Sequence, residues 1–75
     1  MAVDIRASAR KHDISDEDMI HAYDNAFAVH PANPPANTMY IGPSRSGAFI
    51  EVGVVEDDDG DRIIHAMPAR KQWST

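Results

Sequence analysis

Two groups of basic side chains have the residue types needed for acid–base chemistry on a phosphate. The first group is the pair Lys11 and His12, and the second is Arg62, His65 and Arg70. An imidazole exchanges a proton near neutral pH, and cations stabilise the charge that develops on phosphate oxygens in a transition state. These are the parts of a metal-independent ribonuclease. The alternative is that Lys11 and His12 only complement the negative end of a helix dipole.

The other polar residues predict neither a metal site nor a cofactor site. His12, His21 and His30 follow one another at nine-residue intervals, which would turn successive side chains to opposite sides of a continuous helix. The sequence has no cysteine to supply a thiolate ligand. The acidic run at residues 57–61 lacks the spacing of a calcium-binding loop, so we interpret it as a charged hairpin turn.

Composition and charge limit the classes of function. The 75 residues, 43% hydrophobic and 25% charged, are typical of one small globular domain over residues 1–75. The formal net charge of -5 has the wrong sign for a general nucleic-acid binder, so binding RNA would require local clustering of the cations. No apolar run is long enough to span a bilayer, and residues 1–15 lack the hydrophobic core of a signal peptide. We therefore expect a cytoplasmic protein without a membrane partner.

Helical spacing and turn residues predict two helices followed by three strands. A short first helix is expected to stop near Asp13, and Ser15 with the three acids after it predicts the start of a second helix. The proline-rich residues 30–37 are expected to form a loop between the helical part and the sheet. The expected strands are Thr38–Gly42, Ala48–Glu56 and Arg62–Met67. The predicted fold class is α+β, with two N-terminal helices packed on one face of a three-stranded antiparallel meander (ααβββ).

Several segments resemble a family of bacterial toxins. Residues 9–18, ARKHDISDED, resemble the RKHG-[IV]-S-x-E-[ED] segment of BrnT-like toxins from type II toxin–antitoxin systems. Residues 40–42 and 47–52 resemble the hairpin of that family, and residues 62–66, RIIHA, look like its R-I-I-S-A-R strand. No single motif is diagnostic, but together the segments span most of the chain.

The resemblance implies a RelE-like α+β fold, ribonuclease activity that arrests translation, and neutralisation by a cognate antitoxin. Position by position, Lys11, His12 and Arg62 match the polar pattern of the family. Met67 stands where the family has an arginine, and Arg70 is a stand-in for it three positions later. The combined prediction for the catalytic residues is Lys11, His12, Arg62, His65 and Arg70.

Two interpretations without catalysis stay open. One is a protein-interaction module of the same fold, such as a degenerate toxin that retains partner binding. The other is a homodimerising domain that presents Tyr23, Phe27 and Trp73, although Tyr23 and Phe27 also suit a core. The corresponding partners are a cognate antitoxin, RNA and a second copy of the chain. The catalytic interpretation requires His12 or His65 to share a pocket with two cations.

Overall fold

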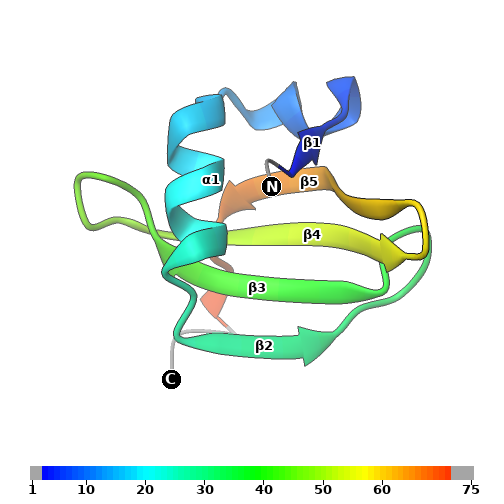
Figure 1. Ribbon diagram of the computed structural model, residues 1–75. Coiled ribbons are helices and arrows are strands. Elements are labelled where there is room, and N and C mark those ends of the chain that lie inside the picture. Colours follow the sequence, from blue (N-terminus) through cyan, green and yellow to red (C-terminus); the bar gives the residue numbers. More distant parts are fainter. Residues whose placement is uncertain (1–2, 72–75) are drawn as a thin grey trace.

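The computed structural model describes residues 3–71, which form a five-stranded sheet with a helical layer on one side (Figure 1). Along the chain the elements are β1 (Asp4–Ile5), the 3₁₀ helix η1 (Ala7–His12), α1 (Asp16–Asp24), β2 (Ala28–Pro31), β3 (Thr38–Pro43), β4 (Phe49–Asp57) and β5 (Gly60–Pro68). The strand order in the sheet is β1-β5-β4-β3-β2. β1 is parallel to β5, whereas the other neighbouring strands are antiparallel.

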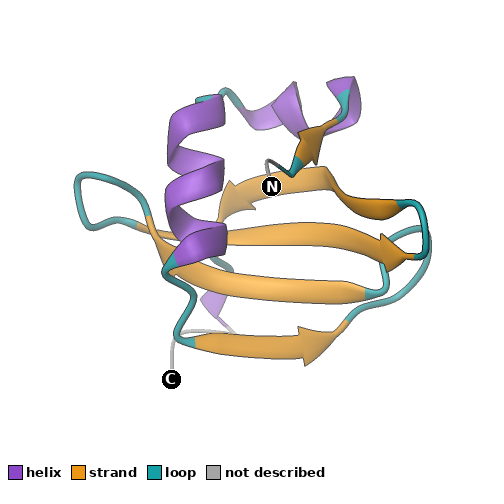
Figure 2. Ribbon diagram, viewed as in Figure 1, coloured by secondary structure: helices purple, strands orange, loops and turns teal. Residues whose placement is uncertain are grey.

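The predicted ααβββ fold is wrong. The sheet is mixed and has five strands, because β1 adds to one side of the β3–β4–β5 meander and β2 adds to the other (Figure 2). Within residues 3–71 only α1 is an α-helix, since the first predicted helix is the six-residue 3₁₀ helix η1. The two added strands have only two and four residues, too short for a period of alternation to identify them.

The proline-rich connection begins later than predicted. His30 and Pro31 belong to β2, so the segment between β2 and β3 comprises residues 32–37. Proline is tolerated in β2 because this strand lies at the edge of the sheet formed by the described residues, where β3 is its one neighbouring strand.

The boundary between the two helical segments follows the sequence prediction. Asp13 ends η1 in the left-handed conformation, with φ at 61°, and Ser15 caps α1 by accepting a hydrogen bond of 3.2 Å from the Asp18 amide. Asp16, Glu17 and Asp18 occupy the first turn, where negative charge complements the helix dipole. Lys11 and His12 therefore lie at the C-terminal end of η1.

The main core lies between the helical layer and one face of the sheet. Met19 and Ala22 of α1 pack with Val52 and Val54 of β4, as the alternation in β4 predicts. Gly42 of β3 allows α1 to approach closely, because a Cβ there would lie only 2.3 Å from the Ala22 carbonyl oxygen. This packing leaves the opposite face of the sheet to the pocket described below.

A β-bulge sets the orientation of His65. Gly53 pairs with His65, but the next residue, Val54, pairs with Ile63, so Ile64 is an extra residue in β5. A Cβ on Gly53 would lie 3.0 Å from the Cβ of His65, so the two residues share one face of the sheet. Since Gly53 alternates with core residues of β4, this face is the one turned away from α1.

No helix within residues 3–71 has the length and apolar character required to cross a membrane.

Candidate functional site

Four of the five predicted catalytic residues line one pocket of about 530 Å³. The pocket lies on the sheet face opposite α1, between η1, β5, the segment after β2 and the residue Arg70 that follows β5. The four residues are Lys11, His12, His65 and Arg70. Two imidazoles and two cations therefore line one pocket, and their catalytic role stays a prediction.

Hydrogen bonds from the Ser8 side chain and the Arg6 backbone hold η1 beside β5 and bring the two histidines together. The Ser8 hydroxyl donates to the Ile64 carbonyl at 2.8 Å, and the Arg6 amide donates to the Ile63 carbonyl at 2.9 Å. The imidazole rings of His12 and His65 consequently lie with their centroids 6.1 Å apart and their planes at 80°. A phosphodiester resting across both rings can have one oxygen near each histidine.

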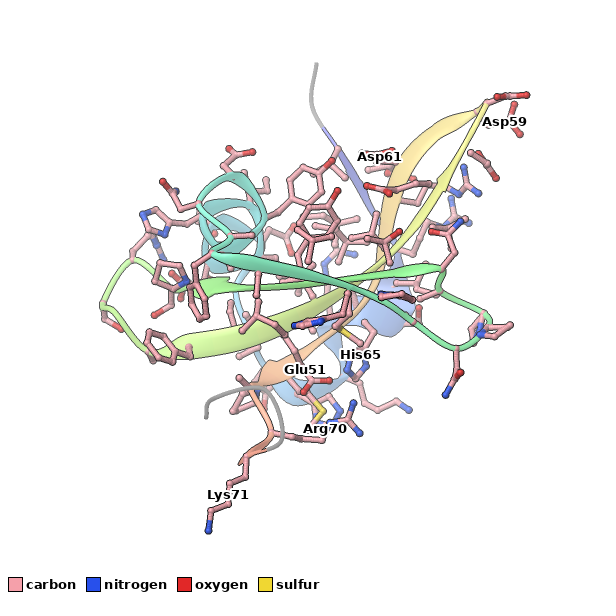
Figure 3. The ribbon with its side chains drawn as sticks, turned by 90° about the horizontal axis from the view of Figure 1, so that it is seen from below. Glu51, Asp59, Asp61, His65, Arg70 and Lys71 are labelled. Atoms are coloured by element: carbon pink, nitrogen blue, oxygen red, sulfur yellow. The ribbon has the colours of Figure 1, made fainter. Side chains whose placement is uncertain are left out.

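Glu51 contacts two of the residues that line the pocket, Arg70 and His65. The sequence analysis did not identify it as a candidate residue. Its side chain is fully buried, and its carboxylate accepts hydrogen bonds from Arg70 Nε at 2.9 Å, Arg70 Nη2 at 2.9 Å and the Arg70 amide at 3.1 Å. His65 Nε2 lies 3.1 Å from the same carboxylate (Figure 3). The signal in the sequence is a lone acid within the otherwise apolar strand segment at residues 50–55.

The charge state of Glu51 determines which nitrogen of His65 can accept a proton. Burial raises the pKa of Glu51, but the hydrogen bonds from Arg70 and His65 lower it more, so the pKa lies below the usual range. An ionised carboxylate only accepts hydrogen bonds, so His65 Nε2 must donate. The neutral ring then carries its lone pair on Nδ1, as a general base requires.

Arg62, the fifth predicted residue, lies elsewhere. Its guanidinium forms two hydrogen bonds, of 3.0 and 2.8 Å, with Asp57 at the end of the β4–β5 hairpin. It lines a second hollow of about 370 Å³ together with Tyr23 and Asp61. Although Arg62 and His65 are close in sequence, the structure does not bring them to the same site.

Two acidic residues, Asp59 and Asp61, line the second hollow, whereas Glu51 contacts Arg70 and His65 at the pocket. Figure 3 shows Asp59 and Asp61 at the far end of the molecule from Glu51, His65 and Arg70. At this acidic end Tyr23 donates a hydrogen bond to Asp61, and burial with this bond raises the pKa of Tyr23. At the pocket the Glu51 carboxylate offsets the charge of Arg70, and Lys11 is a further cation in the lining.

Among residues 3–71 no group of three or more histidine, aspartate or glutamate side chains is arranged to hold a metal ion. Comparisons of the chain with models of protein families, with curated proteins and with solved structures found no match. The resemblance to BrnT-like toxins accordingly stays a prediction that depends on the segments quoted above.

Proposed function

We propose that this protein is a metal-independent endoribonuclease of the BrnT-like toxin type, with its active site in the pocket between η1 and β5. The observation that carries the proposal is the convergence of His12, His65, Lys11 and Arg70 on one pocket. Two imidazoles supply an acid and a base, and two cations meet the charge on the phosphate oxygens.

The geometry around His65 supports a division of roles between the histidines. His65 Nδ1 takes the proton of the ribose 2′-hydroxyl, and the imidazolium that forms is stabilised by Glu51 at 3.1 Å from Nε2. The 2′-oxygen forms a bond to phosphorus while the bond from phosphorus to the 5′-oxygen breaks. His12 acts as the general acid and gives a proton to that leaving oxygen. The products are a 2′,3′-cyclic phosphate and a 5′-hydroxyl.

Lys11 and Arg70 have different tasks in this scheme. The ammonium group of Lys11 lies at the end of a flexible side chain and meets the phosphate as a point charge. Arg70 is held by Glu51 through two guanidinium hydrogen bonds, so its position is fixed before the substrate arrives. In the cell we propose that cleavage takes place in the cytoplasm, arrests translation and is prevented by a cognate antitoxin.

Cleavage of RNA by the purified chain in the presence of a metal chelator tests this proposal. We expect His12→Ala and His65→Ala each to slow cleavage by a factor of about 100 or more, the usual contribution of a general acid or base. His21→Ala is the matched control, because His21 lies on α1, hydrogen-bonded to the Pro43 carbonyl, and does not line the pocket. Equal rates for the wild type and both pocket variants would overturn the assignment.

A non-catalytic interaction module is the second candidate, favoured by an exposed apolar patch. Phe27 and Phe49 are 55% and 51% exposed, and their rings lie 5.0 Å apart. Val29 on the edge strand β2 is also 55% exposed. Phe27 is therefore not a core residue, whereas Tyr23 packs against the core. Trp73, predicted to join such a surface, lies outside the described residues. Binding of a partner that depends on Phe27, without any RNA cleavage, would favour this candidate.

A further inference from the structure

The pocket has two chemically different walls. The wall from η1 and β5 carries the basic side chains assigned above to phosphate chemistry. The opposite wall comes from β2, the connection to β3, and β3 itself. Its lining residues are Pro31, Ala32, Asn33, Pro35, Ala36 and Met39, which are apolar except for one amide. Phosphate binding accounts for the first wall and leaves the second without a role.

We propose that this second wall binds an unpaired nucleobase next to the scissile phosphate and that Asn33 selects the base. The inference rests on the proposed ribonuclease function and specifies its substrate class as single-stranded RNA. A volume of about 530 Å³ exceeds what a phosphate group occupies and falls in the range of pockets for small organic ligands. A flat base with apolar faces and a polar edge matches an apolar wall that carries one amide.

The second wall is held in place by bonds to the sheet. The Ala32 amide donates to the Asn37 carbonyl at 3.1 Å, and the Asn37 amide donates to the Val54 carbonyl at 3.0 Å. The Asn37 side chain is bonded to the backbone of Glu56 in both directions, at 2.8 and 3.0 Å. Together with its prolines, this anchoring lowers the entropy that the wall loses when a ligand binds.

Asn33 has the chemistry needed to distinguish bases. It is the one side-chain amide among the described residues that line the pocket. Its side chain is exposed and makes no hydrogen bond to another residue of the described part of the chain. An amide offers both donors and an acceptor, so it can form a pair of hydrogen bonds with one base edge and leaves polar atoms unpaired against another.

Binding of product-like nucleotides tests the inference without any cleavage. The full chain is titrated with the 3′-monophosphates of adenosine, guanosine, cytidine and uridine, and with inorganic phosphate as the reference. We expect the best nucleotide to bind at least about tenfold tighter than phosphate and tenfold tighter than the worst nucleotide, as one well-placed pair of hydrogen bonds provides. Asn33→Ala should reduce the preference among bases to less than about threefold and leave phosphate binding unchanged.

Two variants test the contributions of the two walls to binding separately. Lys11→Ala should weaken inorganic phosphate and all four nucleotides alike, while keeping their order. Ala32→Tyr, which fills the apolar side, should abolish the advantage of nucleotides over phosphate. Four nucleotides that bind no better than phosphate, or a base preference that survives Asn33→Ala, would overturn the inference.

Failure of this inference is distinguishable from failure of the proposed function. RNA cleavage that depends on His12, without any base preference in binding, would remove the base subsite and leave the nuclease standing. Base-selective binding of nucleotides by a chain that cleaves no RNA would support the subsite and remove the nuclease. Cleavage of a single strand at least about tenfold faster than the same strand in a duplex is expected if both hold, because a paired base cannot enter the pocket.

Discussion

Two arginine–carboxylate pairs in this protein have nearly the same geometry and different surroundings. Arg70 and Glu51 meet through two hydrogen bonds of 2.9 Å, and the Glu51 side chain is fully buried. Arg62 and Asp57 meet through bonds of 3.0 and 2.8 Å, with 26% and 44% of their side chains exposed. The first pair connects to His65 in the pocket, and the second closes a hairpin at the acidic end. The two pairs therefore differ in the burial of the carboxylate and in its neighbours, and not in the type of pair.

Replacing each arginine by alanine should give the largest difference between the two pairs. We expect Arg70→Ala to slow RNA cleavage by a factor of about 100, because a positioned cation no longer meets the phosphate. Arg62→Ala should change the same rate by less than about twofold, since Arg62 does not line the pocket. The measurement is the initial rate of cleavage for both variants side by side. A larger loss with Arg62→Ala would mean that the site lies at the other hollow.

Removing each carboxylate should show the same contrast in stability. Glu51→Ala is expected to lower the free energy of unfolding by about 2 to 3 kcal/mol. The reason is that the buried carboxylate no longer accepts the hydrogen bonds of the Arg70 guanidinium. Asp57→Ala should cost less than about 1 kcal/mol, since the Asp57 carboxylate is partly exposed whereas that of Glu51 is buried. Urea denaturation of the two variants measures both values. Equal losses would show that burial does not distinguish the pairs.

The Glu51→Gln variant tests whether the charge of the buried carboxylate contributes to RNA cleavage. Glutamine keeps the shape but removes the negative charge that stabilises a protonated His65. We expect the pH profile of cleavage to change and kcat to fall by about tenfold or more, the lower part of the range for groups that support acid–base catalysis. Asp57→Asn is the matched control and should leave the profile unchanged. If both variants retain the wild-type profile, Glu51 only holds the fold.

The pH dependence of stability is the smallest expected effect. The pKa of Glu51 in the folded chain lies below the ordinary value of 4.5, so its contribution is complete above that value. The contribution declines as the pH falls from there through the folded-state pKa. The stability difference between wild type and Glu51→Gln should therefore be largest near neutral pH and shrink in acid. A difference that grows on acidification would contradict the assigned direction.

The sequence predicts those features of the fold that depend on residues close together in the chain, such as a helix cap and the core face of a strand. Ser15 caps a helix as its type predicts, and the alternation of Ile50, Val52 and Val54 identifies the core face of β4. The strands β1 and β2 escaped prediction because each is short and gains its stability from a partner across the sheet. Asp4 pairs with Arg62, and no pattern within either segment records that contact.

The sequence shows the residue types of the candidate site but not their arrangement. The chemistry of their side chains makes candidates of four residues that one pocket brings together, namely Lys11, His12, His65 and Arg70. Arg62 was chosen for the same chemistry, yet a nearby acid, Asp57, holds it at the hairpin. Which arginine reaches the pocket depends on the strand register and on where each carboxylate lies. Neither can be read from composition or spacing.

The most direct test of the proposed ribonuclease activity is cleavage of DNA oligonucleotides that each contain a single ribonucleotide. The assay is run in a metal chelator with the wild type, His12→Ala and His65→Ala. Our account predicts one cut, directly 3′ of the ribonucleotide, that leaves a 2′,3′-cyclic phosphate and requires both histidines. An intact oligonucleotide with the wild type, or the same cut with both variants, would contradict it.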